Sequence, residues 1–300
     1  MRIGDVRWAA IVAAVALLLV GCGGAGNPRP DLVFVSSRDG DYTIYAMNAD
    51  GGRQTRLSEA QGATESPRNL YFQIEPAWSP DGDKIGFASR RAGTSDIYVM
   101  NADGTGTVRL TSTKDDDSHP TWSPDGTKIA FARAGDVFVM ASTGSRPRRI
   151  SDPGVEEAEP SWAPDGSWIT YSRRPPGSPA RNIWLMRPDG SERHLVTSQH
   201  GRAFAPAWSP DSRRIALSMN PNDQFFDIYT IGVDGKGLRR LTRTGHDAFE
   251  PAWSPDGRTI AFSRGGAIVM IDLDGNEEEV TDRDNNDSSP AWNPKPPVDE

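Results

Sequence analysis

The chain has 300 residues, a formal net charge of −8 and one cysteine, Cys22. The excess of acidic residues argues against nucleic acid as a partner and favours cationic ones. The single cysteine lies near the N-terminus, which excludes a disulfide framework, a thiolate metal site and a cysteine nucleophile in the folded part of the chain.

Residues 1–21 have the features of a signal peptide. Arg2 and Arg7 precede twelve consecutive apolar residues, 9–20, and these are too few to span a bilayer, because a spanning helix needs about twenty. The tetrapeptide L-V-G-C that ends at Cys22 resembles a bacterial lipobox, and this resemblance implies cleavage before Cys22 and lipidation of its thiol. The alternative is an ordinary signal peptide that happens to contain a cysteine.

We therefore expect an exported protein that is held to the membrane only by the lipid on Cys22. It would face the periplasm, or the outer side of the plasma membrane if the cell has a single membrane. Residues 22–31, rich in Gly and Pro, would then form a flexible tether with a reach of at most about 30 Å.

Near copies of one segment, E-P-A-W-S-P-D-G at residues 250–257, recur along the chain at steps of 39 to 46 residues. The prolines that mark the copies are Pro76, Pro120, Pro160, Pro206, Pro251 and Pro290. Six of the nine tryptophans lie two residues after these prolines, as packing between equivalent units would require. A period in this range indicates an array or a propeller.

Each repeat predicts four short strands. The first contains the Trp, S-P-D-G forms a turn because Pro fixes φ and Gly accepts a positive φ, and a second strand such as residues 85–88 follows. After a loop comes a third strand such as residues 97–100, then a D-G turn, and then a fourth strand that ends in R-L-T or a variant of it. Four short strands per unit, without helical periodicity, are typical of propeller blades.

The two ends of the repeat region complement each other. Residues 32–58 supply a second, third and fourth strand, and residues 289–293 supply a Trp strand with nothing after it. We therefore predict an all-β, six-bladed propeller of four-stranded blades over residues 32–293, closed when the C-terminal strand joins the N-terminal three, with a tail at 294–300. An open array is the alternative, but closure removes exposed edges.

The repeats are similar to those of the TolB-like β-propeller family, in which P-A-W-S-P-D-G is followed by I-A-F, I-Y-V-M, D-G and R-L-T. The resemblance covers residues 32–293 and implies a propeller of WD40-like repeats. Propellers of this kind serve as binding platforms, as parts of peptidases and as lyases, so the resemblance is less specific for function. TolB itself has a separate N-terminal domain where this chain has a tether, so its partners Pal and TolA are not carried over.

Comparison of the copies separates two faces of the predicted propeller. The turns between strands one and two, and between strands three and four, have nearly constant lengths and should lie together on a scaffold face. The loops between strands two and three and the crossings between blades vary in length and should form the other face, where binding specificity is expected. The tether should leave from the scaffold face, so the variable face would point away from the membrane.

The residues directly before the motif prolines should ring the mouth of the central channel. They are Glu75, His119, Glu159, Ala205, Glu250 and Ser289, and Asp247 lies nearby. One interpretation is an acidic mouth that attracts a cation or a basic peptide segment. The alternative is a solvated set of loops, partly neutralised by arginines at the ends of the second strands. These arginines are Arg38, Arg90, Arg133, Arg173 and Arg264.

Four phenylalanines lie in the same set of loops. They are Phe204, Phe225, Phe226 and Phe249. As exposed side chains they would anchor a protein partner. The alternative for them is packing between blades.

The sequence offers less support for an enzyme, because no G-x-S-x-G motif is present. His119, His200 and His246 lie in crossings between blades, as in metal-dependent propeller lyases, but they stand one, six and five residues from the motif prolines, so convergence on one ion is not implied. We assign no catalytic residue and expect no cofactor, with a divalent cation in the central channel as the alternative.

The sequence therefore predicts a monomeric, non-catalytic binding platform for a protein or an envelope polymer, which would use the loop face around the channel. A metal-dependent hydrolase or lyase with its site at the channel mouth is the alternative function.

Overall fold

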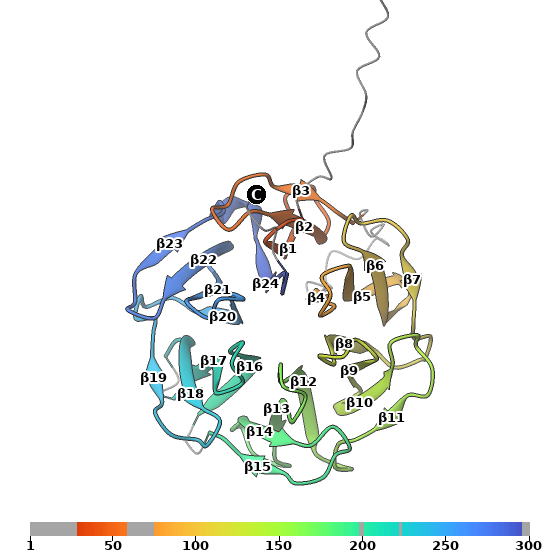
Figure 1. The fold of residues 1–300 in the computed structure, drawn as a ribbon. Helices are drawn as coiled ribbons and strands as arrows, with labels where there is room; N and C mark the ends of the chain where they lie inside the picture. The colour runs from red at the N-terminus through yellow and green to blue at the C-terminus, as the bar shows by residue number, and fades with distance from the viewer. Residues whose placement is uncertain (1–28, 59–74, 198–200, 222–223, 296–300) are drawn as a thin grey trace, which may run out of the picture.

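The computed structural model describes residues 29–58, 75–197, 201–221 and 224–295. The predicted signal peptide, Cys22 and His200 lie outside these residues. The described chain forms six four-stranded sheets around a central axis, each with its innermost strand nearest the axis (Figure 1). No helix in the described residues is both long and apolar enough to cross a membrane. The prediction of a six-bladed, all-β propeller is confirmed.

Each blade is one antiparallel sheet, described here from the innermost strand outward. Blade 1 consists of β24 (Ser288–Trp292), β1 (Leu32–Ser36), β2 (Thr43–Met47) and β3 (Thr55–Arg56). Blade 2 consists of β4 (Ala77–Trp78), β5 (Lys84–Ala92), β6 (Thr94–Asn101) and β7 (Val108–Arg109). Blade 3 consists of β8 (Asp117–Trp122), β9 (Lys128–Arg133), β10 (Asp136–Ala141) and β11 (Arg148–Arg149).

The remaining blades follow the same order. Blade 4 consists of β12 (Glu156–Trp162), β13 (Ile169–Arg174), β14 (Asn182–Met186) and β15 (His194–Leu195). Blade 5 consists of β16 (Arg202–Trp208), β17 (Arg214–Asn220), β18 (Asp227–Gly232) and β19 (Arg239–Arg240). Blade 6 consists of β20 (Ala248–Trp253), β21 (Thr259–Arg264), β22 (Ala267–Asp272) and β23 (Glu277–Glu279), and a short 3-10 helix, η1 (Arg283–Asn285), leads to β24.

Blade 1 is built from both ends of the propeller sequence. β24 pairs antiparallel with β1, with Leu32 opposite Trp292 and Val33 opposite Ala291. The indole of Trp78, in blade 2, donates a hydrogen bond of 3.1 Å to the carbonyl oxygen of Ala291. The predicted closure of the ring by the C-terminal strand is therefore confirmed.

The motif tryptophans link neighbouring blades. The indole of Trp122 donates to the carbonyl of Ala77 at 3.2 Å, and the indole of Trp208 donates to the carbonyl of Ser161 at 3.0 Å. Each acceptor directly precedes the motif Trp of the preceding blade. The indole N–H groups of Trp162, Trp253 and Trp292 have no partner among the described residues, so packing of the large ring between blades, and not this hydrogen bond, is what the motif tryptophans share.

The closing R-L-T sequence ties the fourth strand to the start of the third. In blade 2 the Thr111 hydroxyl accepts a hydrogen bond of 2.9 Å from the Ile97 backbone N–H, and Arg109 forms an ion pair of 2.6 Å with buried Asp96. The equivalent hydroxyls in four other blades are those of Ser58, Thr197, Thr242 and Thr281. The motif thereby satisfies a backbone donor that would otherwise be buried without a partner.

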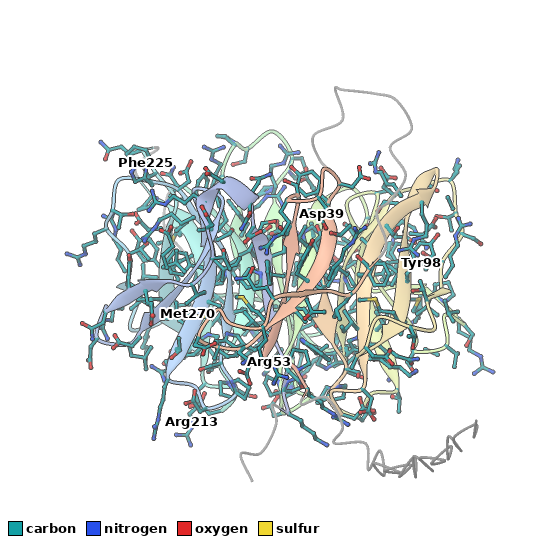
Figure 2. The ribbon with its side chains drawn as sticks, turned by 90° about the horizontal axis from the view of Figure 1, so that it is seen from above. Asp39, Arg53, Tyr98, Arg213, Phe225 and Met270 are labelled. Carbon is teal, nitrogen blue, oxygen red and sulfur yellow. The ribbon has the colours of Figure 1, made fainter. Side chains whose placement is uncertain are left out.

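Figure 2 shows the two faces of the ring. Asp39 and Phe225, from loops between second and third strands, lie on one face, and Arg53 and Arg213, from the short turns, lie on the other. We call these the variable face and the scaffold face. The predicted separation of constant turns from variable loops is confirmed.

The described chain begins on the scaffold face. Arg29 forms an ion pair of 2.6 Å with Asp83 and donates a hydrogen bond of 3.0 Å to the carbonyl of Asp81. Both partners belong to the turn between β4 and β5, and the equivalent turn of blade 5 contains Arg213 on the scaffold face. Arg29, the first described residue before β1, therefore lies on the side that the sequence predicts.

At five of the six junctions the glycine of the turn between the third and fourth strands lies close to the preceding blade. A Cβ atom added at Gly104 would lie 2.2 Å from the carbonyl oxygen of Leu57. At four further junctions the same contact would be 3.0 Å or less, between Gly51 and Val280, Gly144 and Leu110, Gly190 and Ile150, and Gly235 and Val196. Gly275, at the junction of blades 5 and 6, has no described atom within 4 Å of that position.

This difference predicts unequal costs for two glycine substitutions. Gly104 and Gly275 have similar positive φ values, 86° and 96°, so alanine strains the backbone alike at both. Gly104→Ala in addition drives a methyl group into the Leu57 carbonyl, and we expect it to lower the free energy of unfolding by about 1 to 3 kcal/mol more than Gly275→Ala. Urea denaturation of the two variants measures this difference, and equal losses would contradict it.

Candidate functional site

In five of the six blades the residue before the motif proline lies in a β-bulge of the innermost strand. In blade 4 the pairing of β12 with β13 shifts register between Ala158 and Ser161, and Glu159 has a φ of 55°. The equivalent residues have φ values between 50° and 56°, namely His119, Ala205, Glu250 and Ser289. A bulge releases a residue from the regular alternation of a strand and redirects its side chain. The bulge therefore explains why the side chain at this position points in a different direction from those of the neighbouring residues in the strand.

Three glutamates at this position bind the backbone of the next blade. Oε2 of Glu159 accepts a hydrogen bond of 3.0 Å from the Ala205 N–H, and Oε2 of Glu250 accepts one of 2.8 Å from the Ser289 N–H. Glu75 likewise accepts from the N–H of His119. The three glutamates belong to blades 2, 4 and 6, so a carboxylate stands on every second blade around the channel (Figure 1).

His119 is the cationic member of this ring. Its Nε2 lies 2.9 Å from Oε1 of Glu75. Burial by itself would lower the pKa of His119, but the negative charge of Glu75 and its hydrogen bond, helped by Glu159 and Glu250, raise that pKa from its ordinary 6.5 to about 9. His119 is therefore protonated at neutral pH and offsets part of the negative charge of the channel.

The stability of the propeller should depend on pH through this ion pair. Because the folded-state pKa of His119 lies above the unfolded value, the pair stabilises the fold fully below about pH 6.5, and the stabilisation is lost as the pH rises through about 9. We expect His119→Gln to lower the free energy of unfolding by about 1 to 3 kcal/mol near pH 6 and by little near pH 10. Denaturation of both proteins across this range is the measurement; a difference that does not change with pH would contradict the assignment.

Most other acidic residues of the crossings are neutralised by arginine. Asp117 is buried and binds Arg133 through two hydrogen bonds of 2.6 and 2.7 Å. Further ion pairs join Arg38 to Asp287, Arg90 to Asp116 and Arg173 to Glu157. Arg264 instead pairs with Glu277 at 2.7 Å. For these residues the interpretation as neutralised loops is correct, whereas the described residues include no arginine or lysine paired with Glu75, Glu159 or Glu250.

The three histidines proposed as metal ligands are not brought together in the described structure. His119 pairs with Glu75, His246 is exposed, and His200 lies outside the described residues. The described residues contain no group of three or more His, Cys, Asp or Glu side chains placed to hold a metal ion. Asp247 accepts a hydrogen bond of 2.8 Å from the Phe226 N–H, so it fixes a loop of the variable face.

Three of the four phenylalanines form one cluster where blades 5 and 6 meet. The ring centroids of Phe204 and Phe226 are 4.8 Å apart, and those of Phe226 and Phe249 are 5.4 Å apart. All three side chains are half-buried and pack against one another at this junction, as the alternative of packing between blades predicts. Phe225 is different, because it is 44% exposed on the variable face (Figure 2).

A cavity of 510 Å³ adjoins the channel residues and was not predicted from the sequence. It lies between blades 3 and 4, and Ser118 and Ala158, which directly precede His119 and Glu159, form part of its wall. The sequence signal for it is the short loop of blade 3, because β9 and β10 are joined only by Ala134 and Gly135. The other lining residues of the cavity are Ala132, Ala134, Gly135, Asp136, Gly154, Val155 and Glu156.

Solved structures with the same fold include two TolB structures. The chain superposes on TolB from Acinetobacter baumannii with a TM-score of 0.74 and 20% identity, over 88% of this chain and 66% of that one. For the putative TolB from Agrobacterium tumefaciens the values are 0.62, 20%, 88% and 97%. A structure from a nidogen/laminin complex matches with a TM-score of 0.69 at 9% identity, over 87% of this chain and 97% of that one. These likenesses show the fold.

Curated proteins match over shorter segments. The Tol-Pal system protein TolB of Desulfosudis oleivorans is 33% identical over 78 residues, which are 26% of this chain and 16% of that protein. An uncharacterised protein of Agrobacterium fabrum is 34% identical over 76 residues, which are 25% of this chain and 23% of that protein. The matches thus span less than a quarter of these relatives' own length.

The family model described as the TolB beta propeller domain matches residues 68–198 and 178–297. The two matches together cover well over half of the sequence, and they include the motif copies, the glutamates Glu75, Glu159 and Glu250, and the residues that line the cavity described above. The chain therefore belongs to the TolB β-propeller domain family.

Proposed function

We propose that this protein is an exported, lipid-anchored, non-catalytic binding platform. Its ligand is a protein or an envelope polymer with a basic segment, which the variable face holds around the central channel. The observation that carries the proposal is the set of channel glutamates on alternate blades, Glu75, Glu159 and Glu250. These acidic side chains lie on the described part of the variable face, and none of them is paired with an arginine or a lysine.

Two of these glutamates keep one carboxylate oxygen available for a ligand. Glu159 and Glu250 use Oε2 for the next blade, and Oε1 of each has no described protein partner. Burial raises the pKa of Glu250, which shows that its negative charge is costly in the channel. A guanidinium or ammonium group would offset this cost and donate to the free oxygens. The chemistry of the channel mouth therefore favours a cationic side chain.

The cavity between blades 3 and 4 supports a chain segment as the ligand. Its wall contains Ala134, Gly135, Gly154 and Ala158, whose small side chains allow a polymer backbone to approach closely. Its volume of 510 Å³ lies in the range of pockets that hold a ligand of several residues or a small molecule. A segment in this cavity would lie next to Glu159, while exposed Phe225 offers a contact farther out on the same face.

The orientation of the chain supports an anchor on the opposite side. Arg29 lies on the scaffold face, so a tether from Cys22 would place that face toward the membrane and leave the variable face accessible. One relative is named as a Tol-Pal system protein, and this supports a location in the cell envelope.

The lipid anchor predicts a specific form of the N-terminus. We expect mass spectrometry of the membrane fraction to find Cys22 as the first residue, with no unmodified thiol. Cys22→Ser should release the protein from the membrane fraction, because its thiol is the proposed attachment point. Unmodified Cys22 in a membrane-bound protein, or an unchanged distribution of the variant, would contradict the anchor.

Neutralising the channel glutamates should remove binding while the propeller stays folded, with a loss of stability only from the ion pair between Glu75 and His119. In the triple variant Glu75→Gln, Glu159→Gln and Glu250→Gln each side chain keeps an oxygen to accept from the next blade but loses its charge. We expect an arginine-containing peptide, titrated by calorimetry, to bind this variant about tenfold more weakly or worse. A pull-down from envelope extract should lose its partner in the same variant.

A matched control removes three charges elsewhere. Asp83→Asn, Glu192→Gln and Glu278→Gln change the net charge equally, but these residues lie in scaffold-face turns and on the outermost strand. Peptide binding that falls equally in both triple variants would show a general charge effect and would overturn the assignment to the channel. Binding unchanged by the channel substitutions would do the same.

A further inference from the structure

The junction between blades 5 and 6 differs from the other five at the outer wall of the ring. At those junctions the D-G glycine lies against the carbonyl of the residue before the closing Thr or Ser, as Gly104 does against Leu57. The corresponding pair here would be Gly275 and Leu241. Gly275 has no described atom near its Cβ position, so this contact is open.

One missing residue accounts for the gap. Thr111 is the seventh residue after Gly104, whereas Thr281 is only the sixth residue after Gly275. In blade 2 the turn ends at Thr105 and the ladder of β6 and β7 begins only at Val108. In blade 6 the turn ends at Asn276 and Glu277 pairs at once with Ile271. The shorter hairpin keeps its turn within its own sheet, away from blade 5.

A cavity of 400 Å³ adjoins this open contact. Its wall is formed by the outermost strand of blade 5 and by the turn of blade 6, which both lie at the periphery of the ring (Figure 1). The lining residues are Leu238, Arg239, Arg240, Leu241, Arg243, Asp274 and Gly275. The volume is within the usual range for sites that hold small molecules.

The charges of this cavity are not balanced by the protein. Arg240 is held by Asp227 at 2.5 Å and donates to the carbonyl of Thr242 at 2.9 Å. Arg239 and Arg243 are exposed, and neither has an acidic partner among the described residues. Because Asp227 neutralises Arg240, two guanidinium groups without an acidic partner remain in the lining, against one carboxylate, that of Asp274. The cavity is thus positively charged in a chain whose net charge is −8.

The equivalent junction between blades 3 and 4 provides a comparison. A cavity of 480 Å³ is present there as well, lined in part by Arg148 and Arg187. Arg148 donates to the carbonyl of Asp189 at 3.2 Å, and Arg187 pairs with Glu192 at 3.0 Å. The arginines of that cavity are therefore engaged by the protein itself, unlike Arg239 and Arg243.

We propose that the cavity between blades 5 and 6 binds a small phosphate-bearing ligand. Guanidinium groups match phosphate oxygens with paired N–H donors, and two groups without protein partners can hold a doubly charged phosphate. Leu238, which is partly buried, also lines the cavity.

Pyrophosphate is a suitable probe for this site. Calorimetric titration of the full chain at constant ionic strength should show one site, and Arg239→Gln and Arg243→Gln should each weaken binding about tenfold or more, because each removes a hydrogen bond to a charged group. Citrate, a carboxylate of comparable charge, should bind less well if phosphate geometry is what the arginines recognise.

One further variant serves as a control. Arg148→Gln removes an arginine from the equivalent cavity between blades 3 and 4 and should leave pyrophosphate binding unchanged. The proposal is overturned if the wild-type chain shows no binding at millimolar pyrophosphate, if citrate binds equally well, or if Arg148→Gln weakens binding as much as Arg239→Gln does.

Discussion

The contact between neighbouring blades is the constraint on which this structure depends. A four-stranded blade cannot bury its apolar faces alone, so each blade must be covered by the next one around the ring. Contacts of three kinds repeat at these junctions: a carbonyl against a turn glycine, as at Leu57 and Gly104, an indole hydrogen bond, as from Trp122 to Ala77, and a carboxylate on a bulged backbone, as from Glu159 to Ala205. Together they explain why the recurrent residues of the sequence are Gly, Trp and Glu.

The same contacts determine where the chain is free to vary. The channel glutamates have two roles, because one oxygen of Glu159 or Glu250 holds the adjacent blade while the other remains available. A junction can also lose one of its contacts without opening the ring. Between blades 5 and 6 the turn glycine Gly275 makes no such contact with the preceding blade, while the rings of Phe204 and Phe249 pack against each other near the channel. The two candidate sites of this propeller therefore lie at junctions between blades. One uses the free oxygens of glutamates that also hold the next blade, and the other lies where the contact of Gly275 is missing.

Most of the architecture could be predicted from the sequence, because turns such as S-P-D-G and alternating strands are local features and six copies reinforce one another. The site could be predicted only in part. The position before the motif proline identified Glu75, Glu159 and Glu250, but their bonds to the next blade depend on how the ring closes. Phe226 is covered by Phe204 and Phe249, which come from strands far along the chain, so its burial has no local signal. The missing residue before Thr281 is visible in the sequence, but its effect depends on a contact with Leu241.

Closure of the ring by β24 has a consequence for how the protein is made. β1 is the first strand of the propeller in the chain, but its inner edge stays unpaired until Ser288–Trp292 is in place, and Trp78 lacks its acceptor on Ala291 until then. A chain interrupted anywhere before this strand has an unfinished blade and an uncovered neighbour. Chains that lack the last strand therefore keep the exposed edges that proteases and chaperones recognise, whereas in chains that contain this strand the edges are paired.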